Sequence, residues 1–340
     1  MLFISYGTRP EWIKVKPVID ELRKRNIEHK VLFTGQHKDI ANFFFDIRID
    51  LTNNCLDNRL DSIFSEILEK VNKLNILDTA THLLVQGDTA SVAALSLVAF
   101  HRKIKVMHLE AGLRTYNKLH PYPEEVYRQF VSRVADYHFC PTESNKQNLI
   151  EEKTQGEKFV IGNTVLDNLK DIETSYEDKV LVTLHRRENH EHMRHWFKKI
   201  EELAAKYRNL DFYLPIHPNP NVLKHKEVFK NVNVIEPMEH RDLLKFLAKC
   251  KIVITDSGGI QEESSFLKKK CIVCRKFTER QEGIGEHAVI CDSPDSLLKL
   301  FELEVKNYKL NENYVCPYGD GLSSIKLVNI YEKINSLCVE

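Results

Sequence analysis

The chain has 340 residues, 42% of them apolar and 29% charged, which indicates one large or two ordinary folded domains and excludes disorder. Its 49 Lys and Arg residues balance its 49 Asp and Glu residues, so no overall field favours nucleic acid or an anionic membrane as partner. No segment approaches the ~18 apolar residues of a membrane span and no leader peptide begins the chain, which predicts a cytoplasmic protein.

Apolar runs alternate with segments of helical periodicity along almost the whole chain. In the first half we expect strands at residues 2–6, 30–34, 82–86, 105–110, 137–141 and 158–162, and helices at 13–24, 60–74 and 89–102. In the second half we expect strands at 179–184, 212–216, 232–236, 251–255 and 270–274, and helices at 295–310 and 322–337. This alternation predicts an α/β protein with two doubly wound parallel sheets, divided at the polar stretch 170–179.

The eight cysteines are spread over a chain too large to need disulfides, which predicts reduced thiols. Cys271 and Cys274 form a CxxC, but they belong to an apolar run in which positions three apart face opposite ways. No second CxxC or histidine pair lies at ligand spacing. We therefore expect core cysteines and no metal site.

Charged residues follow the predicted strands of the first half, where open parallel sheets bind their ligands. After residues 2–6, Arg9 and Lys14 lie near the start of a helix and suit a phosphate. The turn there is not GxGxxG, so no dinucleotide cofactor is expected. Asp88 follows residues 82–86, where it could also be a simple N-cap. Glu110 ends an otherwise apolar strand, which packing alone does not explain.

Two adjacent acids, Glu124 and Glu125, follow a Pro-x-Pro segment. A surface helix could begin there, because proline and acidic residues are both favoured in a first helical turn. Alternatively, one of the two acids serves a site.

In the second half, His185, Arg186 and Arg187 form a cationic cluster after a predicted strand, with an ordinary solvated loop as the alternative. Residues 257–259, Ser-Gly-Gly, precede a helix expected to open at residues 261–263, Gln-Glu-Glu. Backbone N–H groups beside two glycines suit an anion, and a carboxylate in the first turn of the helix suits a ribose diol. With two sheets, we expect the ligand in a cleft between them.

Eleven segments in chain order then resemble the non-hydrolysing UDP-N-acetylglucosamine 2-epimerases: GTRPE, QGDT, HLEAGLRT, PYPEE, PTE, IGNTVLD, HRREN, IHPNP, TDSGGIQEE, TER and PYGDG. The resemblance covers nearly the whole chain. It implies a glycosyltransferase-B-like fold with two Rossmann-like domains facing a cleft, no metal or nicotinamide cofactor, a UDP-sugar substrate and a homodimer. The domains would be residues 1–170 and 171–321, with the second holding UDP and the helix at 322–340 packing back on the first.

The resemblance also assigns residues by position. The family's catalytic acids fall on Asp88, Glu110 and Glu124, and its histidine on His185, which leaves Glu125 as a structural partner. The family's UDP contacts fall on Arg9, Ser257, Gly258, Gly259, Glu263 and Arg280. Lys14, Arg114 and Arg186 are further candidates for binding the substrate.

The chain departs from the family pattern at several points. Gln86 stands where a histidine is common, and residues 262–270 and 278–282 differ from the usual EEAPSLGKP and TERPE, which leaves the exact sugar open. Members with a second, activating substrate site carry QHRQ and a later arginine. Here residues 36–39 are Gln-His-Lys-Asp and the later position is Asp57, which argues against substrate activation.

The implied chemistry is elimination followed by re-addition. A C2 proton of a nucleotide sugar becomes acidic only as the bond from C1 to UDP breaks, which gives a 2-acetamidoglucal that is then reprotonated on the other face. Four alternatives stay open: a modified substrate (a 6-deoxy-L-hexosamine or a 3-acetamido uronic acid), a hydrolysing 2-epimerase, a retaining glycosyltransferase, and a silent sugar-nucleotide sensor.

Overall fold

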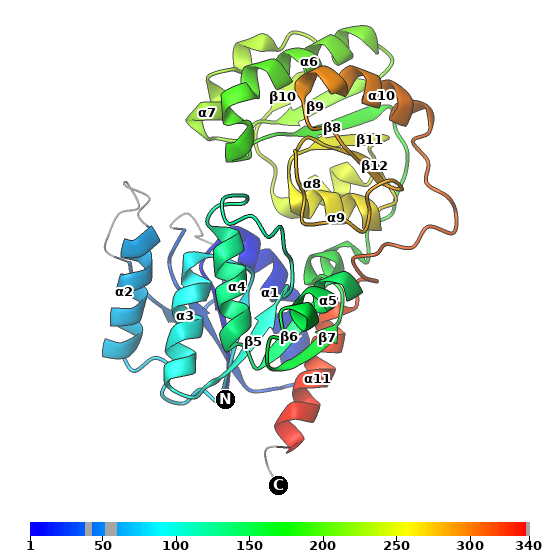
Figure 1. Ribbon diagram of the computed structural model, residues 1–340. Coiled ribbons are helices and arrows are strands. Elements are labelled where there is room, and N and C mark those ends of the chain that lie inside the picture. Colours follow the sequence, from blue (N-terminus) through cyan, green and yellow to red (C-terminus); the bar gives the residue numbers. More distant parts are fainter. Residues whose placement is uncertain (38–42, 52–59, 338–340) are drawn as a thin grey trace. The chain divides into compact units, whose positions relative to one another are not determined.

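The computed structural model describes residues 1–37, 43–51 and 60–337. Contacts between residues divide the chain into two compact units (Figure 1). The N-terminal unit comprises Met1–Asp167 and Gly321–Glu340, and the C-terminal unit comprises Asn168–Asp320. Each unit contains one parallel sheet with helices on both of its faces (Figure 1).

The sheet of the N-terminal unit has seven strands in the order β3-β2-β1-β4-β5-β6-β7, all parallel. The strands are β1 (Leu2–Tyr6), β2 (His29–Phe33), β3 (Ile47–Arg48), β4 (His82–Gln86), β5 (Lys105–Leu109), β6 (Tyr137–Cys140) and β7 (Glu157–Val160). The chain winds from β1 toward β2 on one side and from β4 toward β7 on the other. The switch point between β1 and β4 is where an open sheet of this kind binds its ligand.

Helices cover both faces of this sheet because the apolar residues of its strands alternate in direction. Phe3 and Leu83 pack with the side chains of α2, α3 and α4, whereas Ile4 and Leu84 pack with those of α1 and α11. The helices of the unit are α1 (Arg9–Lys24), α2 (Leu60–Lys73), α3 (Ala90–His101), α4 (Glu124–Val134), α5 (Glu143–Glu151) and α11 (Ser323–Leu337), and the 3-10 helix η2 (Thr164–Leu169) crosses into the next unit.

Helix α1 begins four positions before the expected residue 13, because the residues just before it form a strong helix start. Thr8 is the N-cap, its side chain accepts the Glu11 N–H, and the Glu11 side chain reaches back to the cap backbone. A reciprocal cap of this kind, with Pro10 in the first turn, stabilises a helix N-terminus. The early start brings Arg9 into the first turn of the helix.

The C-terminal helix α11 packs beside α1 in the N-terminal unit (Figure 1). Its start is fixed by Asp167, whose carboxylate accepts the Ser323 and Ser324 backbone N–H groups at 3.0 and 2.7 Å. Further along, Arg25 of α1 pairs with Glu332 at 2.7 Å. The chain therefore returns from the C-terminal unit to the same unit in which it began.

The sheet of the C-terminal unit has six parallel strands in the order β10-β9-β8-β11-β12-β13. Its switch point lies between β8 and β11. The strands are β8 (Lys179–Thr183), β9 (Asp211–Pro215), β10 (Asn233–Ile235), β11 (Ile252–Thr255), β12 (Lys270–Val273) and β13 (Ala288–Ile290). The helices are η3 (Arg187–His192), α6 (Met193–Lys206), α7 (Pro220–Leu223), η4 (Lys226–Val228), α8 (His240–Leu247), α9 (Gly258–Phe266), η5 (Pro294–Ser296) and α10 (Leu297–Lys306).

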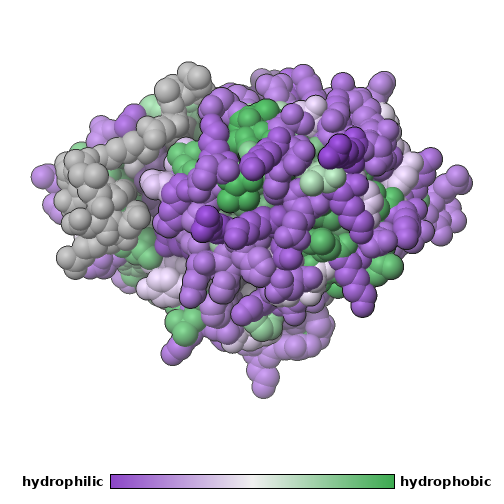
Figure 2. All heavy atoms as spheres, turned by 90° about the horizontal axis from the view of Figure 1, so that it is seen from above, coloured by the Kyte–Doolittle hydropathy of each residue, from purple (hydrophilic) through white to green (hydrophobic). Residues whose placement is uncertain are grey.

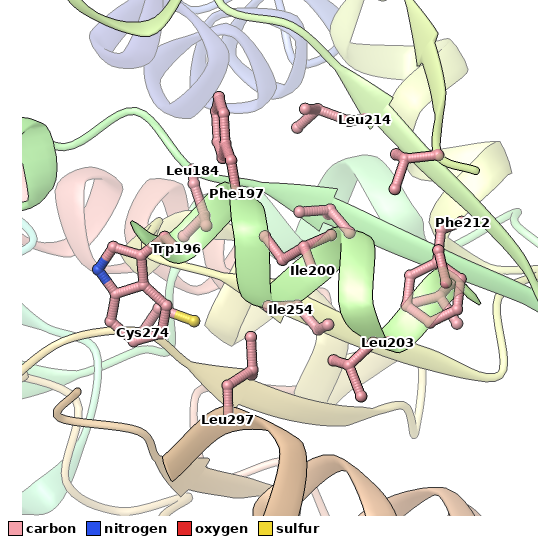
Figure 3. Packing of buried hydrophobic residues seen from close by; sticks show 14 of the residues in the cluster. Leu184, Trp196, Phe197, Ile200, Leu203, Phe212, Leu214, Ile254, Cys274 and Leu297 are labelled. Atoms are coloured by element: carbon pink, nitrogen blue, oxygen red, sulfur yellow. The ribbon is translucent and has the colours of Figure 1, made fainter. Parts of the chain in front are cut away.

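The main core of the C-terminal unit includes the residue that follows β8 (Figure 3). Leu184, the residue directly after β8, packs in this cluster with Trp196 and Phe197 of α6 and with Ile254 of β11. All four side chains are buried. This packing supports from below the turn that carries His185.

Cys271 and Cys274 both lie in the interior at β12, and Cys274 belongs to the core shown in Figure 3. They are free thiols, and within residues 1–37, 43–51 and 60–337 no cluster of three His, Cys, Asp or Glu side chains is arranged to hold a metal ion. Among the same residues, no helix has the length and apolar character needed to span a membrane. The face in Figure 2 is mostly hydrophilic, with hydrophobic residues in small separate groups.

Candidate active site

Glu110 follows β5 and lies at the centre of a set of hydrogen-bond donors in the N-terminal unit. Its Oε2 accepts from Lys14 Nζ and from Gln86 Nε2, both at 2.5 Å, and its Oε1 accepts from Asn163 Nδ2 at 3.0 Å. The side chain is 6% exposed, and the backbone has a φ of 67°, a left-handed conformation that costs free energy for a residue with a side chain. Three donors and a strained backbone hold one charged carboxylate in a fixed position.

Asp88 follows β4 and is not the N-cap of α3. That position is taken by Thr89, whose side chain accepts the Val92 N–H. Asp88 instead pairs with Arg128 of α4, with 2.6 Å between Oδ2 and Nε. Its side chain is 23% exposed, whereas that of Arg128 is 7% exposed. The simple capping role is therefore excluded, and Asp88 presents a partly accessible carboxylate.

The Asp88 and Glu110 turns lie next to each other. A Cβ built on Gly87, the residue before Asp88, would be 3.9 Å from Glu110 Oε2. Gly87 also has a φ of 79°, which glycine adopts readily. The two acids therefore lie together at the ends of the neighbouring strands β4 and β5, beside the switch point between β1 and β4.

Helix α4 begins at Glu124, so the helix start expected from the sequence is present, with Pro123 as its N-cap. Glu124 is one turn before Arg128 on the same face of α4, so the Arg128 ion pair brings this helix face to Asp88. Glu125 is fully buried and accepts the Thr115 and Tyr116 N–H groups at 3.0 and 3.2 Å. Glu125 thus has the structural role expected of it.

A fourth acid, Glu11, belongs to the same region and was not singled out by the sequence. It is 2% exposed, and its Oε2 accepts the Gly7 and Thr8 N–H groups, the latter at 3.2 Å. The pKa of Glu11 is raised to about 7: burial raises it most, hydrogen bonds from Thr89, Gly7 and Thr8 lower it in part, and the nearby Asp88 charge also raises it. The sequence signal that could have identified Glu11 is the segment GTRPE, of which it is the last residue.

The three cationic candidates of the N-terminal unit have different surroundings. Arg9 lies half-buried in the first turn of α1, and Lys14 is paired with Glu110. Arg114 has no exposed side-chain surface: Nε and Nη2 donate to Glu152 at 2.7 and 3.0 Å, and Nη2 also donates to Ser132. Arg114 therefore forms a buried ion pair and has no surface that a ligand could reach. Two of its guanidinium nitrogens already bind the Glu152 carboxylate.

In the C-terminal unit, Asp256 fixes the turn that carries His185. Its fully buried carboxylate accepts the His185 and Arg186 backbone N–H groups at 3.0 and 2.9 Å and the Asn189 side chain at 3.0 Å. The imidazole Nδ1 of His185 lies 3.7 Å from Asp256 Oδ1. Because these residues follow β8 and β11, they occupy the switch point of the second sheet.

The His185 ring is one-third exposed and stacks on the His217 ring, with 4.9 Å between centroids and 14° between planes. Burial lowers the pKa of His185, the Asp256 charge opposes this, and Arg186, His217 and His190 lower it further. Burial lowers the pKa of His217 as well. Of the two arginines in the turn, Arg186 is half-buried, whereas Arg187 is exposed.

Helix α9 begins at Gly258 rather than at residue 261, so the expected carboxylate in its first turn is wrong. Both glycines are helical, Ser257 is the N-cap without a side-chain capping bond, and Glu262 and Glu263 lie in the second turn. The first-turn N–H groups of a helix have no partner within it, so they remain suited to an anion.

Arg280 lies against this helix start. A Cβ on Gly258 would be 2.4 Å from its Nη1, so a side chain there would displace the guanidinium from its present position. Arg280 also donates to Glu279 and, through Nε, to Glu262 at 2.6 Å, and its side chain is 6% exposed. Any phosphate bound by Arg280 must share it with these two carboxylates.

Several partners of the candidate residues were missed by sequence reasoning, although most lie in segments quoted for the resemblance. They are Glu11, Arg128, Asn163, Asp256, His217 and His240. Spacing could have found Arg128, because it follows Glu124 by one helical turn. The doubt about substrate activation rests on Lys38, Asp39 and Asp57, which lie outside the described residues.

Two doubly wound parallel sheets with charged side chains at both switch points define a nucleotide-binding class of α/β enzyme. Within that class, a sequence model of the family "UDP-N-acetylglucosamine 2-epimerase" matches residues 20–332. A UDP-N-acetylglucosamine 2-epimerase of Neisseria meningitidis is 37% identical over 355 residues, covering 94% of this chain and 95% of the relative. The chain therefore belongs to the UDP-N-acetylglucosamine 2-epimerase family.

Solved structures agree over the full length. A crystal structure of UDP-GlcNAc 2-epimerase from Neisseria meningitidis bound to UDP-GlcNAc has a TM-score of 0.86 and 33% identity, covering 98% of this chain and 99% of that one. The complex of Staphylococcus aureus MnaA with UDP has a TM-score of 0.88 and 30% identity, covering 100% and 98%. The resemblance and the doubly wound α/β fold class predicted from the sequence are confirmed.

Proposed function

We propose that this protein catalyses the reversible C2 epimerisation of UDP-N-acetylglucosamine to UDP-N-acetylmannosamine. The observation that carries the proposal is the pair of fixed carboxylates, Asp88 and Glu110, on adjacent turns at a switch point, in a chain of the 2-epimerase family. Relatives named for this activity cover nearly the whole chain, whereas no observation favours a hydrolase, a glycosyltransferase, a sensor or a modified sugar.

In the proposed reaction, the bond between C1 and the UDP oxygen breaks and UDP leaves with the bonding electrons. A carboxylate removes the C2 proton, and the C–H electrons form the C1=C2 double bond of a 2-acetamidoglucal. Addition of a proton to the opposite face of C2 and return of UDP to C1 complete the inversion. No net oxidation occurs, so the reaction needs no electron carrier.

The N-terminal unit would supply the proton transfers through Asp88, Glu110 and Glu124, with Lys14 holding Glu110. General acid–base groups each contribute roughly 10²–10⁴ in rate. Glu110 is suited to act as a base because its three donors favour the charged carboxylate. Asp88 lies close enough to Glu11 for its charge to contribute to the raised pKa of Glu11.

The C-terminal unit would hold UDP. The start of α9 at Ser257, Gly258 and Gly259 offers N–H groups to the phosphates, and Glu263 offers a carboxylate to the ribose. Positive charge to stabilise the departing diphosphate would come from Arg9, His185, Arg186 and Arg280. Arg114 is left out because its guanidinium is buried against Glu152. A homodimer, on the family resemblance, and a cytoplasmic location, as expected from the sequence, are part of the same proposal.

The test is incubation with UDP-N-acetylglucosamine in D2O, followed by NMR of the anomeric and C2 signals. We expect deuterium at C2 in both epimers, with UDP still attached to the sugar. Free N-acetylmannosamine with released UDP would identify a hydrolysing enzyme instead. No deuterium at C2 and no manno product would discard this substrate.

A further inference from the structure

Glu263, which would contact the ribose, is paired in the C-terminal unit with His240, a residue that has no role in the reaction proposed above. His240, the first residue of α8, lies with its Nε2 2.8 Å from Oε1 of Glu263 in α9. The Glu263 side chain is 3% exposed and that of His240 is 22% exposed. A mostly buried carboxylate is thus held by one partly accessible imidazole.

The neighbouring acid has a different partner. Glu262 has a fully buried side chain and accepts from Arg280 Nε at 2.6 Å, so its charge is matched by a guanidinium. Among the described residues, His240 is the one that donates a hydrogen bond to the Glu263 side chain. A carboxylate has about four acceptor positions, so Glu263 keeps capacity for hydroxyl donors of a ligand.

Its position on α9 defines the ligand chemistry. Glu263 lies five residues after Gly258, which is roughly 7–8 Å along the helix axis at a rise of 1.5 Å per residue. Helical side chains lean toward the N-terminus, so the carboxylate points back toward the N–H groups that suit phosphates. A phosphate site at one end and an acceptor-only group a few ångströms away match a nucleoside diphosphate with free ribose hydroxyls.

We propose that His240 is a positioning residue that orients the Glu263 carboxylate, and that the pair thereby sets a preference for ribonucleotides over deoxyribonucleotides. This inference rests on the proposed function, because it assumes that α9 holds UDP. The imidazole N–H fixes one carboxylate oxygen, so the other oxygen faces the ribose hydroxyls in one orientation. A ribose lacking one hydroxyl leaves a mostly buried acceptor unsatisfied, which is costly.

The experiment measures Kd by calorimetry for UDP, 2′-deoxy-UDP and 3′-deoxy-UDP with the full chain. Wild-type protein should bind UDP at least ~10-fold more tightly than one of the deoxy analogues, because losing a hydrogen bond to a charged group weakens binding by about that factor. His240→Phe should weaken UDP binding by roughly 10-fold and the deoxy analogue by less than about 3-fold. His240→Gln keeps an N–H donor and should retain most of the discrimination.

A matched control is His195→Phe. His195 of α6 also donates to a carboxylate of the same unit, that of Asp295 in η5 at 3.1 Å, but both of these side chains are exposed. This variant should leave all three affinities unchanged. Equal loss of UDP and deoxy-UDP binding in His240→Phe, or no loss, overturns the inference, and thermal melting of each variant separates lost binding from lost folding. Failure of the wild-type chain to bind UDP overturns the proposed function and the inference with it.

Discussion

The Asp256 carboxylate lies next to the His185 imidazole, with 3.7 Å between Oδ1 and Nδ1. It also accepts the backbone N–H groups of His185 and Arg186, so one buried group fixes both the turn and its ring. The two residues are 71 positions apart in sequence and meet because β8 and β11 are neighbours in the sheet. This arrangement makes Asp256 a positioning residue that acts through His185.

Replacing Asp256 by Asn should therefore slow turnover by about 10–100-fold while UDP binding changes little. Asn keeps one acceptor oxygen for the turn but removes the negative charge next to the ring. Burial already lowers the pKa of His185, and Asp256 opposes this, so the variant should lower that pKa further. NMR titration of the His185 ring in both proteins measures the shift, with exposed His195 as an internal control.

The same relationship gives a stricter comparison. If Asp256 acts only through His185, adding Asp256→Asn to a His185→Ala protein should cause no further loss of turnover, because interacting residues are not additive. An additive loss in the double variant would show that Asp256 has a separate role. An unchanged ring titration in Asp256→Asn would contradict the electrostatic argument.

Glu110→Gln is expected to reduce kcat by at least about 100-fold with nearly normal UDP binding. Glutamine has the same shape and can still accept from Lys14 and Gln86, but it cannot take a proton. Kinetics of epimerisation and calorimetry with UDP separate the two effects. Glu143→Gln, an exposed acid at the start of α5, is the control and should behave as wild type. Near-normal turnover of Glu110→Gln would remove Glu110 from the mechanism.

Sequence reasoning located the strand ends because apolar runs followed by charged residues mark them directly. Asp88, Glu110 and His185 were found in that way. The sequence did not predict the order of the strands in the sheet, and it is this order that brings Asp256 next to His185. The start of α9 was also misplaced, because the two glycines were taken as a loop, whereas they form the first turn of the helix and Arg280 packs against Gly258.

Arg114 shows a second limit of the sequence. Arg114 was a candidate for binding the substrate, but the structure pairs its guanidinium with Glu152 and Ser132, which lie far along the chain. Nothing in the segment around Arg114 indicates these contacts. Residue type and strand-end position are therefore sufficient to nominate a site residue, whereas the partners that occupy its hydrogen-bonding groups come from the tertiary structure.

Arg114→Met should accordingly destabilise the N-terminal unit rather than weaken UDP binding selectively. The change leaves Glu152, 13% exposed, without its arginine, and breaking such a buried pair typically costs about 3–5 kcal/mol. Urea unfolding measures the loss, and adding Glu152→Gln should recover part of it because the unpaired charge is removed. Unchanged unfolding together with lost UDP binding would restore Arg114 as a ligand-binding residue.

Glu11 predicts a dependence of stability on pH. In the folded protein its pKa is raised to about 7 from an ordinary value of 4.5, mainly by burial. The folded state therefore keeps a proton that the unfolded chain releases between these values. This contribution to stability is complete below about pH 4.5 and is lost as pH rises through 7, by up to about 3 kcal/mol.

Glu11→Gln is neutral at every pH and should not show this loss, although it keeps an acceptor for the Gly7 N–H. The free energy of unfolding of the variant, relative to wild type, should rise by roughly 1–3 kcal/mol between pH 5 and pH 8. Urea unfolding at each pH, followed by fluorescence of Trp12 in a Trp196→Phe background, reports the N-terminal unit. Glu157→Gln, at an exposed position in β7, should show no such rise. A constant difference between Glu11→Gln and wild type across this range would mean that Glu11 is ionised in the folded protein at pH 5, and that the donors at the start of α1 outweigh its burial.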